Sequence, residues 1–326
     1  MRKLSKYPFC WLLAIFLIGE TGVRLVNDDV TDGNYEFGLC PEEGMREVDG
    51  VLQLNWTHQR RFRQQRMPMG KTEGRKRIFV FGDSVARASA AQVPYAARIG
   101  ESLREMGVDV EVVNFAAIGV GCRKVRAIMR SALKYDPDLV VLHINAHNEA
   151  FDERDWKLRQ QFLNWHPRFW LAHSQLFRSV GDWKRVELYD RLIPGIVGPM
   201  VQGNEKFVLH EQWQAGVYSN RVARVRRVVA ENVAIARASG AKILLVSPVR
   251  VVAQDGMLQF DDEGFDEYCR SRRGGGVEFV SMTEVFQSVS PVDTFLQGDG
   301  VHLDSPGHAR LGRALADHIV EAKLLD

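Results

Sequence analysis

The stretch of this sequence best suited to chemistry is Gly82-Asp83-Ser84, which directly follows the strand-like run Arg77–Phe81. Apolar residues at helical spacing from Val85 to Met106 predict a helix behind the serine. In open α/β sheets the functional crevice lies outside the carboxyl ends of the strands. A serine there, with the N–H groups of a helix pointing toward it, suits a reaction in which negative charge develops beside its hydroxyl. The alternative is a plain turn in which Asp83 or Ser84 caps the helix.

Three further loop segments lie at the ends of predicted strands or before the last helix: Asn114–Gly121, Asn145–Glu149 and Asp299–Leu303. If the strands are parallel, all three segments lie on the same rim of the sheet as Ser84. The pair Asp299-Gly300 is also common in simple surface turns. His308 is a second candidate base, although we expect it in the first turn of the last helix.

The segments between these groups alternate between strand and helix patterns. Strands are predicted at Val108–Phe115, Leu139–Ile144, Ala241–Val246 and Val277–Val280, and helices at Cys122–Tyr135, Tyr218–Ser239 and Pro306–Leu325. This order predicts an α/β fold with a parallel sheet and helices on both faces. His143 and His147 flank a strand end instead of sharing one helical face, so no metal site is expected.

Four of these blocks together resemble the SGNH hydrolases, the GDSL-type esterase and lipase superfamily. Gly82-Asp83-Ser84 matches the first block, Gly119 the glycine of the second, Asn148 the asparagine of the third, and Asp299 with His302 the last. Ala146-His147-Asn148-Glu149 is similar to the G-H-N-E third block of some membrane-anchored members, with alanine in place of glycine. The resemblance covers about residues 77–326 and implies a three-layer α/β/α sandwich with a flavodoxin-like parallel sheet.

The resemblance also implies a role for each matching residue. Ser84 is expected to be the nucleophile, His302 its general base, and Asp299 the carboxylate that orients the imidazole. The backbone N–H groups of Ser84 and Gly119 and the side-chain amide of Asn148 are expected to form the oxyanion hole. No metal or organic cofactor is implied.

The N-terminal residues carry a targeting pattern. The basic residues Arg2, Lys3 and Lys6 precede an uncharged, apolar stretch from Tyr7 to Gly19, and acidic residues follow it. We interpret residues 1–26 as an uncleaved signal anchor or transmembrane segment, with a cleaved signal peptide as the alternative. The positive-inside rule then places the body of the protein outside the cytoplasm. There, Cys40, Cys122 and Cys269 can form at most one intramolecular disulfide.

One further segment lies between the anchor and the hydrolase-like blocks, and another lies among the blocks themselves. Residues 27–76 are interpreted as a juxtamembrane linker whose basic run either attracts anionic headgroups or is a solvated spacer. Residues 151–217 are interpreted as an insertion in the domain that spans residues 77–326. The insertion holds five of the seven tryptophans, with Trp165 and Trp170 as candidate substrate contacts, and it fits a lid, a membrane-resting surface or a small subdomain core.

The composition and net charge bear on the kind of partner that this protein binds. The chain has 326 residues, 45% of them hydrophobic, and a net charge of +2, which gives no support for a nucleic-acid partner. Together with the N-terminal pattern, the resemblance implies an extracytoplasmic serine ester hydrolase whose substrate is an acyl ester such as an O-acylated glycan or lipid. The alternatives are an O-acyltransferase on glycans that uses the same residues, or a non-catalytic glycan-binding or scaffold protein on this fold.

Overall fold

A five-stranded parallel sheet forms the centre of the computed structural model, which describes residues 8–26, 44–54, 62–88, 91, 93–144, 148, 176, 215–254, 257–262, 264–296 and 300–326. Across the sheet the order is β10-β7-β6-β4-β5, and every neighbouring pair is parallel. This is the flavodoxin-like order, in which the first strand along the chain lies between the second and the third. The predicted α/β fold is confirmed. The strands are β4 (Lys76–Phe81), β5 (Val110–Asn114), β6 (Leu139–His143), β7 (Lys242–Val246) and β10 (Val277–Val280).

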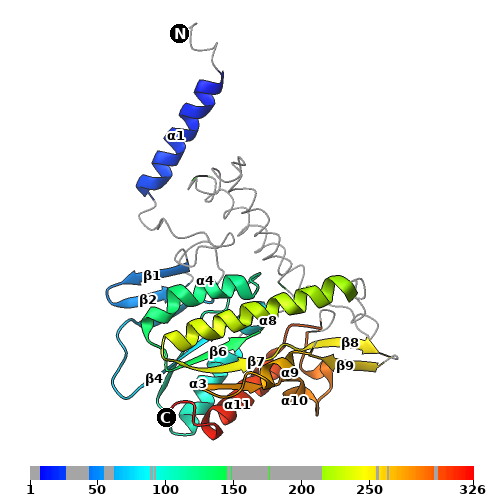
Figure 1. The fold of residues 1–326 in the computed structure, drawn as a ribbon. Helices are drawn as coiled ribbons and strands as arrows, with labels where there is room; N and C mark the ends of the chain where they lie inside the picture. Colours follow the sequence, from blue (N-terminus) through cyan, green and yellow to red (C-terminus); the bar gives the residue numbers. More distant parts are fainter. Residues whose placement is uncertain are drawn as a thin grey trace.

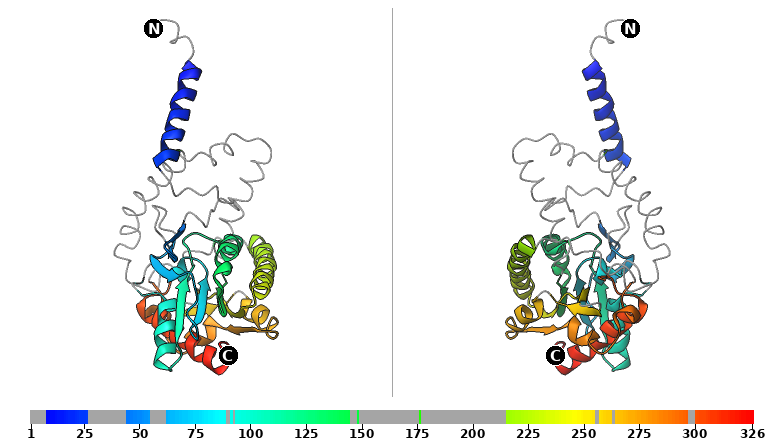
Figure 2. Two further views of the ribbon diagram at one scale, coloured as in Figure 1. Left: turned by 90° about the vertical axis from the view of Figure 1, so that its left-hand side faces the viewer. Right: turned by 90° about the vertical axis from the view of Figure 1, so that its right-hand side faces the viewer.

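Helices cover both faces of the sheet because alternate side chains of each strand point to opposite sides. In β4, Ile78 and Val80 join one buried cluster, whereas Phe79 and Phe81 join another. The first cluster includes residues of α3 (Tyr95–Glu105), α10 (Met282–Phe286) and α11 (Ser305–Glu321). The second includes residues of α4 (Cys122–Ala132), α8 (Ala215–Ala238) and α9 (Phe265–Arg270). The three layers are visible in Figures 1 and 2.

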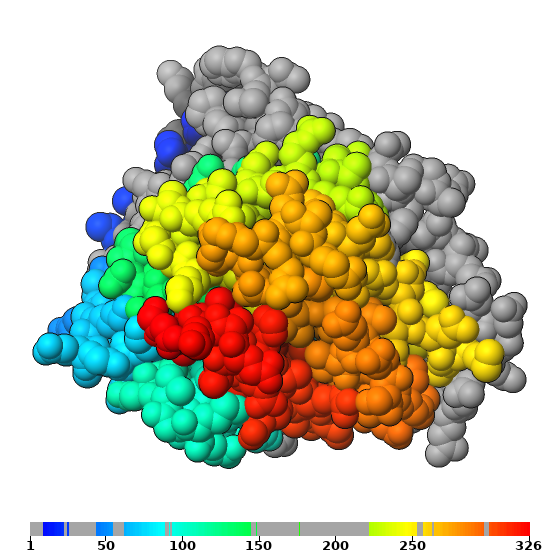
Figure 3. Space-filling view, turned by 60° about the horizontal axis from the view of Figure 1, so that its bottom comes forward, coloured from blue at the N-terminus to red at the C-terminus, as the bar shows by residue number. Residues whose placement is uncertain are grey.

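Helices α3 and α11 pack closely on one face, where α11 lies in red beside the cyan-green segment in Figure 3. Gly312 of α11 makes this approach possible. A Cβ at that position would lie 2.3 Å from Arg98 Cβ and 2.9 Å from the Tyr95 carbonyl oxygen. The last helix is thereby fixed against the helix that follows the Ser84 segment, which brings the two ends of the domain together.

The sequence predicted one helix from Val85 to Met106, but the structure divides it. Helix α2 spans only Ser84–Arg87 and ends at Ala88, whose φ of 61° is left-handed. Helix α3 then begins behind Pro94. Proline fits the start of a helix but not its interior, because it lacks an N–H and its ring clashes with the preceding turn. Pro94 therefore explains the division.

Part of the predicted juxtamembrane linker, residues 27–76, is folded. Strands β1 (Met45–Val48), β2 (Val51–Leu54) and β3 (Gln65–Pro68) form an antiparallel meander. Met45, Leu52, Leu54 and Met67 of this meander are buried in the same cluster as α4 and α8. Strands of four residues are too short for a clear alternating pattern, which explains why the sequence did not predict them. Residues 27–43 and 55–61 lie outside the described part of the chain.

Several residues of the basic run have partners within the protein, so these residues do not belong to a solvated spacer. Arg77 is only 1% exposed, pairs with Glu111 at 2.8 Å, and donates to the carbonyl oxygens of Tyr135 and Pro68 at 2.7 and 2.9 Å. Lys71 pairs with Asp138 at 2.7 Å. Arg77 thus ties the sheet to the chain that precedes it.

Besides the meander, helix α1 (Pro8–Val26) and a β-hairpin are not part of the central sheet or of the helices that cover it. Helix α1 lies within the predicted anchor, residues 1–26, and its apolar side chains are largely exposed. None of the helices that the structure describes has both the length and the apolar character needed to cross a membrane. A hairpin of β8 (Arg250–Gln254) and β9 (Met257–Asp261) follows β7. Short 3₁₀ turns at Leu133–Tyr135 and Pro291–Asp293 complete the described elements. Cys122 and Cys269 are buried and are not joined in a disulfide, and Cys40 lies outside the described residues.

The contacts of Arg77 predict a large effect on stability. We expect Arg77→Met to lower the free energy of unfolding by about 3 kcal/mol, because it leaves Glu111 and several carbonyl oxygens without their donor. Arg75→Met is the matched control, since Arg75 pairs with Asp109 on an exposed surface and its loss should cost less than about 1 kcal/mol. Denaturant unfolding of both variants measures the difference. Equal losses would contradict the structural role of Arg77.

Candidate active site

The turn after β4 places Ser84 at the carboxyl edge of the sheet. Gly82 is required at this turn, because a Cβ there would lie 2.7 Å from Ala86 Cβ and 2.9 Å from His143 Cβ. Asp83 caps the short helix α2, and its Oδ1 accepts from the Val85 N–H at 2.9 Å. The capping role that the sequence allowed for this tripeptide therefore belongs to Asp83. Ser84 is the first residue of α2, and its hydroxyl faces another loop.

That loop carries His302. The Nε2 atom of His302 lies 2.8 Å from Ser84 Oγ, although the two residues are 218 positions apart in the chain. This is hydrogen-bond distance, and it suits transfer of the hydroxyl proton to the imidazole. Both loops lie beyond the carboxyl ends of the parallel strands, and β4 lies at the switch point of the strand order, where such folds place their sites.

Backbone hydrogen bonds on both sides hold the His302 loop. The Gly300 carbonyl oxygen accepts from the Val251 N–H of β8 at 2.7 Å. The His302 carbonyl oxygen accepts from the Leu296 N–H at 2.8 Å, and an isolated bridge pairs Phe295 with Leu303. The β8–β9 hairpin therefore supports the loop from one side, and the segment around residue 295 supports it from the other.

Asp304 then joins this loop to the last helix. Its side chain accepts from the Gly307 N–H at 2.8 Å, which caps α11. Its own N–H donates to the Thr294 carbonyl oxygen at 3.1 Å. The position of His302 is consequently fixed at both ends of its loop.

Gly119 and Asn148 lie on the two neighbouring loops. The loop after β5 is registered against the Ser84 turn, since the Ala117 N–H donates to the Gly82 carbonyl oxygen at 3.1 Å. Gly119 follows with a φ of 67°, a left-handed conformation that glycine adopts readily. Asn148 Nδ2 donates to Asp83 Oδ2 at 3.3 Å, so the amide lies beside the residue that precedes Ser84.

Burial and nearby groups shift the pKa of the Asp83 carboxyl in opposite directions. Its side chain is only 2% exposed, and this burial raises the pKa of the carboxyl. The nearby His302 and the backbone N–H groups of Val85 and Ala86 act in the opposite direction and lower it. Asp83 therefore supplies an acceptor that holds both the start of α2 and the amide of Asn148.

A stack of buried rings, which the sequence did not predict as a unit, lies under the rim. Tyr95 stacks between His143 and His308, with ring centroids 5.9 Å apart on each side. The Tyr95 hydroxyl lies 3.2 Å from His143 Nδ1, and its backbone N–H donates to His308 Nδ1 at 3.3 Å. His143 closes β6, and so the stack supports the strand end that leads toward Asn148. His308 is in the first turn of α11, as predicted.

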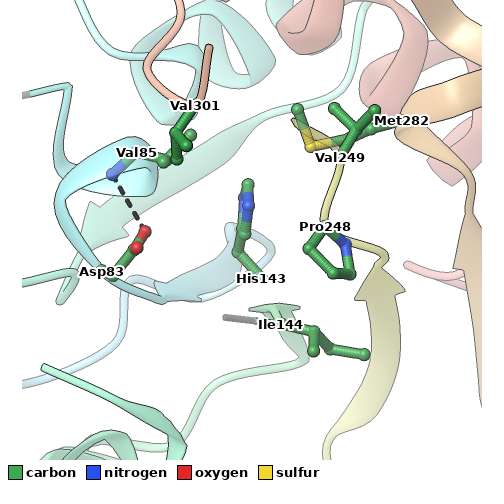
Figure 4. A pocket seen from close by; sticks show the side chains of 8 residues that line it. All are labelled: Asp83, Val85, His143, Ile144, Pro248, Val249, Met282 and Val301. Atoms are coloured by element: carbon green, nitrogen blue, oxygen red, sulfur yellow. Dashed lines mark hydrogen bonds between the residues drawn. The ribbon is translucent and has the colours of Figure 1, made fainter. Parts of the chain in front are cut away.

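A small cavity of about 10 Å³ lies beside Asp83 and His143. Asp83 and His143 line part of it, and the remaining lining residues, shown in Figure 4, are Val85, Ile144, Pro248, Val249, Met282 and Val301. This volume is about what one water molecule needs, so an acyl chain does not fit into it.

The remaining predicted site residues cannot be placed in this geometry. Asp299, Trp165 and Trp170 lie outside the described residues, as do His147 and most of the insertion at 151–217. Within the described part of the chain, no group of three or more histidine, cysteine or carboxylate side chains is arranged to hold a metal ion. The structure thus brings Ser84 and His302 together and places Asn148 beside Asp83.

Comparison with known proteins gives structural similarity only. No protein-family model matches the sequence, and no curated protein matches it. A lipase from a goat rumen metagenome is 11% identical, with a TM-score of 0.47, over 74% of this chain and 96% of the lipase. TesA is 18% identical, with a TM-score of 0.46, over 77% of this chain and 100% of that protein.

A variant of an acetyl xylan esterase from Geobacillus stearothermophilus is 16% identical, with a TM-score of 0.43, over 75% of this chain and 94% of the esterase. These identities and TM-scores are low, and they do not carry an activity over to this chain. The function must be argued from the chain's own residues.

His308 gives a prediction about stability and pH. Burial lowers its pKa from 6.5 to about 3 in the folded protein, with Arg63 and His302 adding to the effect. Between pH 6.5 and 3 the unfolded chain binds a proton that the folded protein does not, so the free energy of unfolding falls as the pH falls. The slope from this group is at most about 1.4 kcal/mol per pH unit.

We expect His308→Gln to be less stable than the wild type at pH 7, because the stack with Tyr95 is lost. Its free energy of unfolding should nevertheless fall less steeply between pH 6.5 and 4.5. Denaturant unfolding at several pH values measures both slopes. Parallel curves for the two proteins would show that His308 is not held neutral in the folded state.

Proposed function

We propose that the protein is a serine ester hydrolase in which Ser84 is the nucleophile and His302 the general base. The observation that carries this proposal is the 2.8 Å contact between Ser84 Oγ and His302 Nε2 at the carboxyl edge of the sheet. A serine hydroxyl is a weak nucleophile unless a base within hydrogen-bond reach takes its proton. The fold brings the two side chains together from loops far apart in the sequence, which is the arrangement that acyl transfer needs.

The proposed reaction has two halves. His302 Nε2 takes the proton of Ser84 as Oγ attacks the ester carbonyl carbon, and it then gives that proton to the departing alcohol. Water next attacks the acyl-enzyme with His302 again as base, which releases the carboxylic acid and restores Ser84. Asp299 would orient the imidazole and stabilise its charged form, as the resemblance to SGNH hydrolases implies.

The tetrahedral intermediates carry a negative oxygen that needs hydrogen-bond donors. We assign this role to the backbone N–H groups of Ser84 and Gly119 and to the amide of Asn148. The amide has two N–H groups, and the bond from one of them to Asp83 would fix the direction of the other. Donors that are already oriented before the reaction lower the barrier without further reorganisation.

The substrate is proposed to be an acyl ester on a larger molecule, such as an O-acylated glycan or a lipid. The cavity beside Asp83 is too small for an acyl chain, so it is not our candidate for the acyl site. Trp165 and Trp170 of the insertion are our candidates for contacts with the part of the substrate remote from the ester. Aromatic side chains suit stacking on sugar rings and burial of apolar chains.

The triad assignment predicts strongly non-additive kinetics. On a short-chain ester, Ser84→Ala and His302→Ala should each lower the rate by several orders of magnitude. The double variant should be little worse than either, because nucleophile and base act as one unit. Asp299→Asn should cost less than His302→Ala, and Asn148→Ala should cost about 10²–10³-fold with the thermal midpoint unchanged.

Steady-state hydrolysis by the purified variants measures these effects. If Ser84→Ala retained more than a few per cent of the wild-type rate, Ser84 would not be the nucleophile. If the two single losses multiplied in the double variant, the residues would act separately, and another base would have to be sought.

We also propose that the N-terminal segment anchors the domain on the outer side of a membrane. Support comes from the basic residues before helix α1, the exposed apolar side chains of α1, and the acidic residues Asp28, Asp29 and Asp32 after it. Cleavage of the segment as a signal peptide is the alternative, and it would leave a secreted domain on the same side.

This orientation predicts the behaviour of a reporter enzyme fused after Asp326. A reporter that is active only outside the cytoplasm should be active in this fusion, and one that is active only inside should not. Fractionation of the same cells separates an anchored protein from a secreted one. Activity of the cytoplasmic reporter would contradict the orientation.

A further inference from the structure

The short helix that carries Ser84 is held by a residue from the N-terminal meander. Arg63 Nη1 donates to the carbonyl oxygens of Ala88 and Ala91 at 3.0 and 2.9 Å, and it lies 3.4 Å from that of Arg87. Arg87 Nη2 in turn donates to the Phe62 carbonyl oxygen at 3.2 Å. Two arginines therefore link the segment before β3 to the end of α2, in both directions.

Helix α2 needs such support because it is only one turn long. A single turn fixes several backbone dihedral angles for very few hydrogen bonds and does not persist alone. The turn also ends in Ala88, and a left-handed conformation costs a residue with a Cβ about 1 kcal/mol. Side chains from other segments donate hydrogen bonds to the last carbonyl oxygens of α2. Asn114 Nδ2 donates to the Ala86 carbonyl oxygen at 2.9 Å, and Arg63 donates to the carbonyl oxygens of Arg87 and Ala88.

The backbone around Arg63 is itself fixed. Phe62 and Met67 are each only 1% exposed and belong to the core cluster on one face of the sheet. The Gln65 side chain makes a reciprocal pair with the backbone of Asn114, donating to its carbonyl oxygen and accepting from its N–H, both at 2.9 Å. Arg63 is thus held between a buried phenylalanine and a strand that is bonded to β5.

Arg63 and Arg87 place positive charge beside the C-terminal end of α2, although burial disfavours the charged form of both side chains. Burial lowers the pKa of Arg63, and burial together with Arg63 lowers the pKa of Arg87 to about 10. Both groups remain charged at neutral pH. A cation at the C-terminal end of a helix is favourable because the free carbonyl groups carry partial negative charge.

We propose that Arg63, held in place through Phe62 and Gln65, is a positioning residue for Ser84. This inference rests on the function proposed above. Arg63 fixes the carbonyl end of α2, and the N-terminal end of the same turn is the nucleophile. A displacement of α2 by a fraction of its length moves Ser84 Oγ away from His302 Nε2.

The test compares three variants of the full chain. Arg63→Met should lower kcat for a short-chain ester about 10²-fold, the scale expected for a nucleophile misplaced by about 1 Å, with KM within about twofold of the wild type. Arg63→Lys should recover part of this loss, because it keeps the charge but not the forked donor. Arg66→Met is the matched control, since Arg66 is an exposed arginine of the same segment, and it should leave kcat unchanged.

Hydrogen exchange gives a second measure that does not depend on activity. Arg63→Met should speed amide exchange in the peptide that covers residues 84–91, while the peptides of β6 and β7 keep their wild-type protection. Wild-type kcat in Arg63→Met, or faster exchange throughout the sheet, would overturn the positioning role. An inactive wild-type protein would instead refute the proposed function, and the exchange pattern would still report on Arg63.

Discussion

The hydrogen bond between His302 Nε2 and Ser84 Oγ depends on two loops being held in register across the carboxyl edge of the sheet. Neither loop contains enough local structure to define its own position. The parallel sheet brings both to one rim because β4 lies between β5 and β6, where the strand order reverses. The hydrogen bonds that hold the Ser84 turn and the His302 loop keep this 2.8 Å contact in place.

The two partners of this contact are supported by different means. The His302 loop is held by backbone hydrogen bonds, from β8 to Gly300 and from Leu296 to His302 itself. The Ser84 turn is held largely by side chains: Asp83 caps its start, and Asn114 and Arg63 take its last carbonyl oxygens. A backbone ladder tolerates many substitutions, whereas each of these side chains is specific. Substitutions on the serine side should therefore affect the site more than those on the histidine side.

The sequence predicted the sheet and its rim well because the buried strands are continuous apolar runs and the polar loops follow them directly. Ser84 and His302 could be named in advance because their sequence blocks resemble those of the SGNH hydrolases. The meander could not be predicted, since its strands are only four residues long and lie in a run rich in arginine. The roles of Arg63, Gln65 and the Tyr95 ring stack depend on contacts between distant segments, which no local pattern encodes. The break between α2 and α3 was predictable from Pro94. It was missed because the apolar residues on both sides of the proline keep a helical spacing.

The central claim is that Ser84 becomes acylated with His302 as its base. The most direct measurement is mass spectrometric mapping of the residue that an alkyl fluorophosphonate modifies in the purified protein. The account predicts a single phosphonyl adduct on the peptide that contains Ser84, formed far more slowly in His302→Ala and absent in Ser84→Ala. An adduct on another residue, or equal labelling rates in the wild type and His302→Ala, would contradict it.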